Sequence, residues 1–403
     1  MRERRRKIAK TTPKGKIGAL LEVLLAAGKL GLTSFGGPAA HLAYFHHEYV
    51  HRRKWMDERS YADLVALCQF LPGPASSQAG IGIGIARAGL LGGFAAWLGF
   101  TMPSFFMLLA FAFFLQRFDA GGAGWIHGLK LVAVAIVAHA VYAMGQKLAP
   151  DQGRATVAVA AAAAVLLWPS AFVQILVIAA AGLLGLWLFR KETAENAAFL
   201  RIPVGKAVAL GCLALYFMLL AALPMLRAVV ENERLAMFDS FYRAGALVFG
   251  GGHVVLPLLE QEVVPTGWVS REAFLAGYGA AQAVPGPLFT FAGYLGAVGG
   301  GAAEAAIALA GIFLPGFLLV AGALPFWNEL RKSAKLQGAL AGINAAVVGI
   351  LLAALYNPLW TSAVREPADF AMAAALFAML AFWKLPPLAV VAAGAAGGAL
   401  YGL

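Results

Sequence analysis

The side chains of this sequence best suited to chemistry are two cations, each placed shortly before a glycine-rich break in an apolar stretch. Lys29 precedes Phe35-Gly36-Gly37, and Arg243 precedes Phe249-Gly250-Gly251. A cation inside an apolar segment is costly unless it faces a cavity or a partner of opposite charge. We therefore expect Lys29 and Arg243 to hold an anionic substrate, although cations that reach from helix ends to the membrane surface would show the same pattern.

Two further breaks contain proline. Pro72-Gly73-Pro74 and Pro285-Gly286-Pro287 each interrupt an apolar stretch, because proline lacks an N–H group and disfavours helix in the residue before it. Non-helical backbone at membrane depth is tolerated only against protein or a water-filled cavity. A helix that restarts after such a break directs free N–H groups and the positive end of its dipole into that cavity, which favours an anion. Simple kinks with hydroxyl caps are the alternative interpretation.

Polar residues beside the breaks complete the predicted substrate site. His41 and His253 follow the glycine-rich breaks and could cap a helix or handle protons, while hydroxyls after the proline breaks could donate to a ligand. The predicted substrate-binding residues are Lys29, Ser34, Phe35, Gly36, Gly37, His41, Gln69, Pro72, Gly73, Pro74, Ser76, Ser77, Gln78, Arg243, Phe249, Gly250, Gly251, Gly252, His253, Gln282, Pro285, Gly286, Pro287 and Thr290. No Walker loop or GxSxG motif occurs, and we expect no enzyme activity, cofactor or metal.

The elements that position these residues come in two copies. Every motif above recurs at a nearly constant offset of about 213 residues, which identifies an internal duplication. We expect a basic cytoplasmic segment at 1–16, a first repeat at 17–190, a linker with an extra transmembrane helix at 191–230, and a second repeat at 231–403. One extra span between the halves would invert the second relative to the first, and inverted repeats are typical of transporters whose substrate binds at the repeat interface.

The composition shows which environment these elements occupy. The chain has 403 residues, of which 61% are hydrophobic and only 13% charged. A soluble globule would lack the polar residues to cover its surface, and a disordered chain would be far less hydrophobic. We therefore expect an all-α polytopic membrane protein. Its net charge of +11 is explained by basic cytoplasmic loops rather than by nucleic-acid binding.

Loop charges predict the orientation. The loop at 46–59 is basic whereas its counterpart at 259–272 is acidic, and the bias reverses at 329–335. Basic loops favour the cytoplasm, which places the N-terminus inside and the C-terminus outside. Broken, re-entrant hairpins are expected at 17–50, 61–86, 236–257 and 273–299, and full spans near 88–115, 128–147, 155–168, 172–189, 206–226, 302–326, 338–357, 367–383 and 386–402.

The two copies of the broken motifs resemble the chromate ion transporter (CHR) family, in its long form with two homologous halves. The resemblance is carried by the segment from Lys29 to His41 and by Gln69-Phe70-Leu71-Pro72-Gly73-Pro74, with their second copies, and it extends over the chain past residue 17. It implies export of chromate across the bacterial inner membrane and resistance to chromate. Pro38 is replaced by Gly252 in the second copy, so we do not expect the halves to contribute equally.

We accordingly expect a secondary transporter for chromate, embedded in the lipid bilayer. Because chromate is a dianion, an inside-negative potential favours its exit by about 2.3 kcal/mol per charge per 100 mV, and a proton gradient is the other driving force that the resemblance allows. A carrier of sulfate or another oxyanion, an anion channel and, more remotely, a membrane enzyme remain alternatives. A homodimer is left open.

Overall fold

The computed structural model describes residues 15–118, 124–189, 204–330 and 332–401. All regular structure within these ranges is helical, as the sequence predicts. Five helices are long and apolar enough to cross a membrane: Ala75–Arg117, Gly124–Leu148, Lys206–Val229, Ala302–Phe326 and Ala334–Ala363. Each contains one of the predicted spans, so the all-α polytopic class is confirmed. The basic segment expected at 1–16 lies almost wholly outside the described residues, and so does the part of the linker before residue 204.

The first half contains α2 (Lys16–Thr33), α3 (Gly37–Phe45), the π-helix η2 (His46–Arg52), α4 (Glu58–Phe70), α5 (Ala75–Phe118), α6 (Gly124–Leu148), α7 (Gln152–Leu167) and α8 (Ala171–Leu188). The extra helix α9 (Lys206–Val229) follows. The second half contains α10 (Glu233–Leu247), η4 (Gly252–Val254), α11 (Val255–Val263), α12 (Arg271–Ala281), η5 (Leu288–Thr290), α13 (Phe291–Gly300), α14 (Ala302–Ala323), η6 (Leu324–Phe326), α15 (Trp327–Leu330), α16 (Ala334–Ala354), η7 (Leu355–Trp360), α17 (Thr361–Ala363), α18 (Pro367–Ala381) and α19 (Pro387–Tyr401).

Equivalent elements in the two halves break at equivalent places. α2 and α10 each end just before a glycine-rich break, and α4 and α12 end before a proline break. The long helix α5 kinks at Ala88 and Gly89, where Gly89 has a φ of 72°. In the second half the corresponding chain interrupts between α13 and α14 at Gly301, whose φ is 105°. The sequence therefore predicted the helix breaks correctly.

The predicted spans 155–168, 172–189, 367–383 and 386–402 all form apolar helices, which are Gln152–Leu167, Phe172–Leu188, Pro367–Ala381 and Pro387–Leu400. These helices are shorter than the five long ones. With 15 residues each, α18 and α19 extend about 22 Å, less than the ~30 Å of bilayer hydrocarbon. Prolines between the paired helices, at Pro169 and at Pro386-Pro387, end or start them early.

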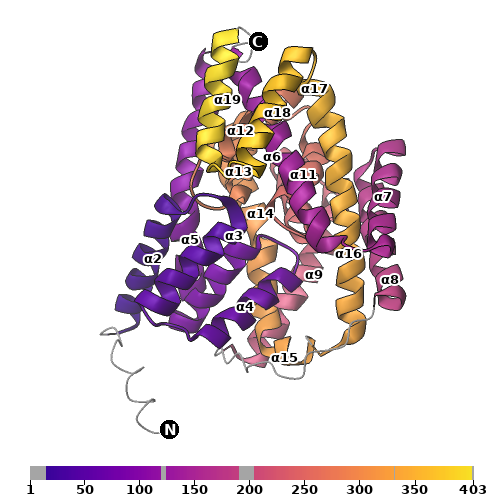
Figure 1. Cartoon of the computed structure of the whole chain (residues 1–403). Helices are drawn as coiled ribbons and strands as arrows, with labels where there is room; N and C mark the ends of the chain where they lie inside the picture. Colours follow the sequence, from indigo (N-terminus) through magenta and orange to yellow (C-terminus); the bar gives the residue numbers. More distant parts are fainter. Residues whose placement is uncertain (1–14, 119–123, 190–203, 331, 402–403) are drawn as a thin grey trace.

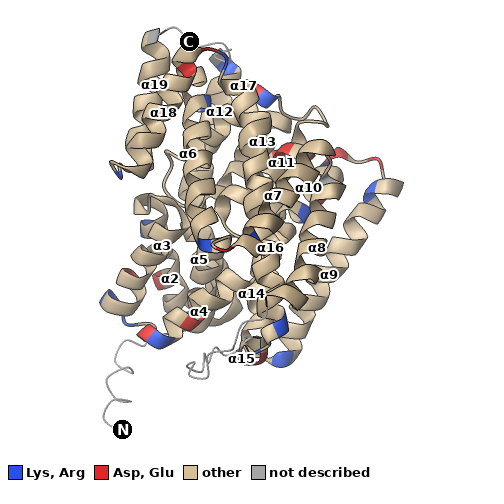
Figure 2. Cartoon of the chain, turned by 45° about the vertical axis from the view of Figure 1, so that its right-hand side comes forward, with Lys and Arg blue, Asp and Glu red and all other residues tan. Residues whose placement is uncertain are grey.

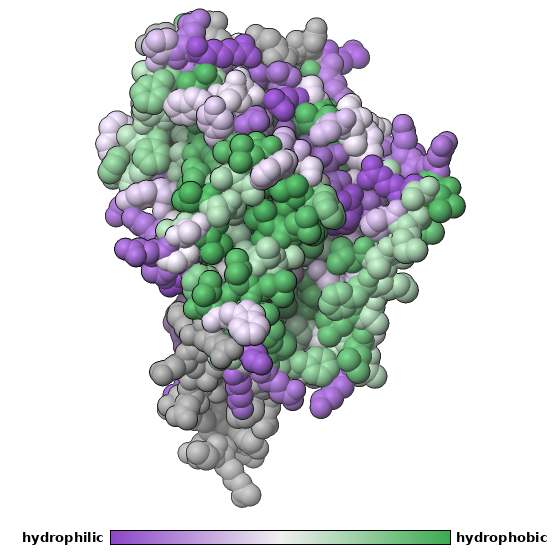
Figure 3. All heavy atoms as spheres, turned by 90° about the vertical axis from the view of Figure 1, so that its right-hand side faces the viewer, coloured by the Kyte–Doolittle hydropathy of each residue, from purple (hydrophilic) through white to green (hydrophobic). Residues whose placement is uncertain are grey.

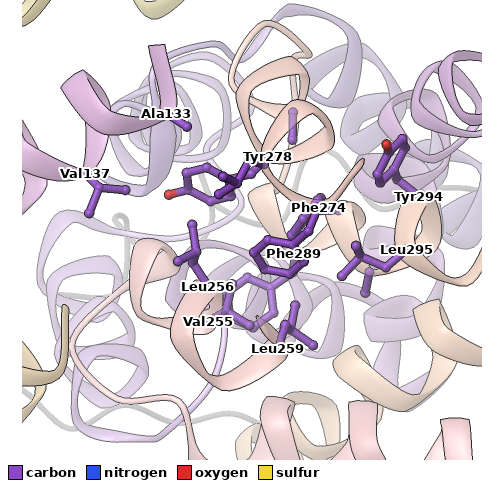
Figure 4. Packing of buried hydrophobic residues seen from close by; sticks show 14 of the residues in the cluster. Ala133, Val137, Val255, Leu256, Leu259, Phe274, Tyr278, Phe289, Tyr294 and Leu295 are labelled. Carbon is purple, nitrogen blue, oxygen red and sulfur yellow. The ribbon is translucent and has the colours of Figure 1, made fainter. Parts of the chain in front are cut away.

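Apolar side chains fill the centre of the molecule. The largest buried cluster joins α6 to the second half, and its members include Val137, Val255, Tyr278 and Phe289 (Figure 4). A second cluster holds α2, α3 and α4 against both arms of α5 and against the end of α14, through residues such as Val320. In the first cluster α6 lies against α12, α18 and α19, so an element of the first half forms one wall of the second. This packing fixes the broken elements of one half against those of the other.

The two ends of the molecule differ from its middle. Figure 1 places α2, α3 and α4 towards the lower end, and α11, α12 and α13 with the last helix α19 towards the upper end. Figure 2 shows charged residues at both ends and also at heights between the ends. An apolar surface extends between them over the face shown in Figure 3, as a helical bundle in lipid requires.

Candidate functional site

All four breaks meet at the centre of the molecule, where each half hydrogen-bonds to the other. The N–H group of Gly73 donates to the carbonyl oxygen of Val248 at 2.7 Å, and that of Gly286 donates to Ser34 at 2.9 Å. Gly73 and Gly286 are equivalent in the two halves, and so are Ser34 and Val248. The proline break of each half is therefore tied to the glycine-rich break of the other in a reciprocal pair. The sequence expectation of converging breaks agrees with this geometry.

Glycine is required at both proline breaks. Gly73 and Gly286 have φ values of 121° and 96°, a region that other residues rarely adopt. A Cβ atom on Gly286 would lie 2.9 Å from Ser104 Oγ, and one on Gly73 would lie 2.8 Å from Gln78 Nε2. Both glycines thus allow the backbone to turn and the two halves to approach closely.

A cavity of about 530 Å³ lies beside these breaks, within the usual size range of ligand pockets. Six of the predicted site residues line it: Gly36, Gly37, His41, His253, Gln282 and Gly286. Its wall also includes residues of α6, such as Ile136, His139 and Met144, and of the α18–α19 region, such as Leu380, Lys384 and Leu385. Both halves of the chain therefore contribute to one cavity.

The N-terminus of α3 faces this cavity. Gly36 is the N-cap of α3, with a φ of 98°, and no side chain caps the helix. Gly36, Gly37, Pro38 and Ala39, which form the cap and first turn, all line the cavity. The first N–H groups of a helix have no partner within it, and with the helix dipole they favour an anion.

Three histidines line the cavity. His41 Nδ1 lies 3.3 Å from Ser76 Oγ, and His253 Nδ1 lies 2.7 Å from the hydroxyl of Tyr278. His139, on α6, was not among the predicted site residues. An imidazole can donate a hydrogen bond to an oxyanion in either protonation state, so the three rings offer donors from both halves.

Lys384 is the cationic side chain in the cavity wall, and the sequence reasoning missed it. It occupies the connection between α18 and α19, has a φ of 52° and is exposed. The signal was present, because Lys384 stands between two apolar stretches just as Lys29 does. The predicted spans 367–383 and 386–402 leave Lys384 in the loop between them, outside the predicted site.

Several buried polar atoms near the breaks lack protein partners. Among the residues that the structure describes, Ser34 Oγ, Ser77 Oγ, Gln78 Oε1 and Gln282 Nε2 make no hydrogen bond. Burying a polar group without a partner costs free energy, so these atoms are suited to interact with water or a ligand. Gln282 lines the cavity directly.

Neither of the two predicted substrate cations lines the cavity. Lys29 is exposed on α2. Arg243 is half-buried and bonds to two carboxylates, with 2.6 Å between its Nη1 and Glu262 Oε1 and 3.0 Å between its Nη2 and Asp239 Oδ2. Its charge is thus already balanced by protein groups, and the structure does not bring it together with Lys29.

The remaining predicted residues surround the breaks without lining the cavity. Those buried there are Ser34, Gly73, Pro74, Ser76, Ser77, Gln78, Gly252, Pro285, Pro287 and Thr290; Phe35, Pro72, Phe249 and Gly251 are half-buried; Gln69 and Gly250 are exposed. Gly252 still marks the junction of the halves, because a Cβ atom there would lie 3.6 Å from Cγ of its counterpart Pro38.

Comparison with known proteins now identifies the family. A sequence profile described as "Chromate transporter" matches residues 21–186 and 235–399. The chain belongs to the chromate transporter family. Members of this family are membrane transport proteins, and the five spanning helices agree with a multi-pass membrane protein.

Named relatives cover nearly the whole chain. It is 29% identical over 388 residues to a chromate transport protein of Pseudomonas aeruginosa, covering 92% of this chain and 89% of that protein. A chromate transport protein of Cupriavidus metallidurans is 27% identical, with 93% and 90% covered. A probable chromate transport protein of Synechococcus elongatus is 27% identical, with 92% of each chain covered. No solved structure matches the chain significantly.

Proposed function

We propose that this chromate transporter family member carries chromate across the membrane, and that the anion binds in the cavity between the two halves. The observation that supports this most is that cavity itself, because the first turn of α3, three histidines, Gln282 and Lys384 all line it. Chromate is a tetrahedral dianion that needs several hydrogen-bond donors and positive charge. The uncapped helix N-terminus and Lys384 would supply the charge, and the polar side chains the donors.

We further propose that transport is export across the inner membrane of a bacterium, with resistance to chromate as its consequence. The N-terminus would be cytoplasmic and the C-terminus periplasmic. The halves 17–190 and 231–403 would be inverted repeats separated by α9, in keeping with the opposite ends at which α2–α4 and α11–α13 lie in Figure 1. An inside-negative potential would then drive the dianion outward, at about 2.3 kcal/mol per charge per 100 mV.

The test is chromate uptake by inverted membrane vesicles that contain the protein. The variants Lys384→Ala and Lys29→Ala are compared with the wild type. Loss of one hydrogen bond to a charged ligand costs about 1.5–3 kcal/mol, so we expect Lys384→Ala to raise the KM for chromate by roughly 10-fold or more. Lys29→Ala should stay within about twofold of the wild type, because Lys29 is exposed and does not line the cavity.

The reverse result is a raised KM for Lys29→Ala and an unchanged KM for Lys384→Ala. It would exclude the cavity as the chromate site. Collapsing the potential should slow uptake, and uptake that is insensitive to the potential would contradict electrically driven export. Sulfate has the same shape and charge as chromate, so competition by excess sulfate would identify a broader oxyanion carrier.

A further inference from the structure

A cluster of potential metal ligands lies away from the cavity, at the turn between η2 and α4. His46 Nε2 lies 2.5 Å from Glu58 Oε2, and His51 Nε2 lies 3.5 Å from Glu58 Oε1. One ligand atom from each of the three residues lies within 4.8 Å of the others. His46 is half-buried while His51 and Glu58 are exposed, so an ion could reach the cluster from solvent.

The π-helical winding of η2 brings the two histidines together. His46 and His51 are five residues apart, and in an α-helix residues with that spacing point in different directions. A π-helix has its hydrogen bonds between residues five apart, so these residues are stacked on one face, and short π-helical segments are frequent at functional sites. The ring centroids of His46 and His51 are accordingly 4.7 Å apart. Glu58, the first residue of α4, provides the third potential ligand.

The equivalent corner of the second half shows what a purely structural contact looks like there. Glu260 and Arg271 occupy the positions of His46 and Glu58, and they form an ordinary ion pair at 3.4 Å. That pair joins α11 to α12 with one carboxylate and no imidazole, which is too few ligands for a transition-metal ion. The first half has two imidazoles and a carboxylate at the corresponding place. A contact that only joins the two segments does not require these three residues.

We propose that His46, His51 and Glu58 bind a divalent transition-metal ion of the zinc type. Imidazole nitrogen and carboxylate oxygen are usual ligands of such ions, and two histidines with one carboxylate leave a position open for water. Ligand atoms bound to one zinc ion lie about 3–3.5 Å apart, so the observed spacings need only small side-chain adjustments. The neighbouring cations Arg52 and Arg53 are directed to Glu48.

A metal ion here would join two segments that lead to the central breaks. η2 continues α3, which carries His41, and α4 leads to Pro72-Gly73-Pro74. Because the ion would bind only the folded protein, it would raise the stability of the protein by mass action. The site is independent of the proposed chromate cavity, so it can be tested without a transport assay.

The experiment is titration of Zn²⁺ into the full-length, untagged protein in nanodiscs, by calorimetry and by thermal unfolding. The variants are His46→Ala, His51→Ala and Glu58→Gln. His47→Ala is the matched control, because His47 is an exposed neighbour outside the three-ligand cluster. We expect one ion per chain and a Zn²⁺-dependent rise in Tm for the wild type and the control, and at least a 10-fold weaker Kd in each of the three variants.

Co²⁺ provides a second readout, since three protein ligands and a water should give the intense visible absorption of a four-coordinate site. Equal Zn²⁺ affinity in the wild type and the three variants would overturn the proposal. So would the absence of stoichiometric binding in the wild type. A cooperative thermal unfolding transition, recorded without metal, would show that each variant is folded. A loss of Zn²⁺ binding could then be attributed to the missing ligand.

Discussion

At the scale of single residues, the position that most constrains the molecule is the glycine between two prolines. Gly286 adopts a φ of 96° and donates its N–H group to Ser34 in the other half. Gly73 does the same towards Val248. Backbone in this region is accessible to glycine at low cost and strained for other residues. One residue type thus permits the turn and the contact between the halves together.

Gly286→Ala should therefore destabilise the protein. The added Cβ atom would meet Ser104 Oγ at 2.9 Å and the carbonyl oxygen of Phe100 at 3.2 Å, at a φ that alanine rarely adopts. Strain of this kind costs about 1–3 kcal/mol, so we expect a clearly lower Tm in detergent micelles. Gly145→Ala is the control, because a Cβ atom on this helical glycine meets nothing within 4 Å. An unchanged Tm for Gly286→Ala would show that the break is not under this constraint.

The residue scale also shows how far sequence reasoning could reach into the site. Gly36, His41, His253 and Gln282 were predicted because they belong to a motif that occurs twice. His139 and Lys384 belong to no such motif, and only folding brings α6 and the α18–α19 connection to the same cavity. Lys29 shows the opposite limit, since apolar neighbours along the chain do not reveal which face of α2 a side chain occupies.

At the scale of elements, ion pairs join the two arms of each glycine-rich hairpin. In the first half Arg53 bonds to Glu48 at 2.6 Å and lies 3.4 Å from Glu22 on α2. In the second half the charges are exchanged, with Arg243 on α10 bonded to Glu262 on α11. Burial raises the pKa of Glu48, but hydrogen bonds and charge from Arg53 and Arg52 outweigh it and hold that pKa below its ordinary value. Glu48 therefore stays ionised within its ion pairs near neutral pH.

Arg243→Gln tests whether Arg243 stabilises its hairpin or binds substrate. Removing one partner of a buried ion pair costs about 3–5 kcal/mol, and Glu262 would lose the most, since Arg227 still lies 3.4 Å from Asp239. We expect a lower Tm with little change in the KM for chromate. Lys29→Gln, at the equivalent position of the first half, should change neither quantity. A raised KM at an unchanged Tm for Arg243→Gln would instead assign its charge to the substrate.

Element boundaries were predictable where glycine or proline ends a helix, and less so where depth in the membrane matters. The break after Thr33 and the kink at Gly89 follow from local backbone chemistry. The lengths of α18 and α19 do not follow from local backbone chemistry. An apolar stretch has the same composition whether it crosses the bilayer or turns back within it. Pro386-Pro387 separates the two helices, and both of them lie against α6.

At the scale of the whole molecule, the reciprocal contacts agree with the proposed arrangement of two similar halves that face opposite ways. The hydrogen bonds from Gly73 and Gly286 relate the halves by an approximate twofold operation. The cavity is nevertheless asymmetric, since it takes α3 from the first half and Lys384 from the second. A duplicated chain can thus keep a symmetric frame while its binding groups diverge, as the replacement of Pro38 by Gly252 already indicates.

The proposed opposite orientation of the halves predicts which loops face which side. Lys332 precedes α16 at the end where α15 lies, and Ala368 lies in the first turn of α18 at the other end (Figure 1). Both residues are exposed. After Cys68 and Cys212 are replaced by alanine, a membrane-impermeant maleimide should label Ala368→Cys in intact bacterial cells within minutes. It should label Lys332→Cys only after the membrane is permeabilised, because basic loops stay in the cytoplasm. Labelling of both cysteines from the same side would contradict the proposed topology of the second half, in which the chain between these two residues crosses the membrane.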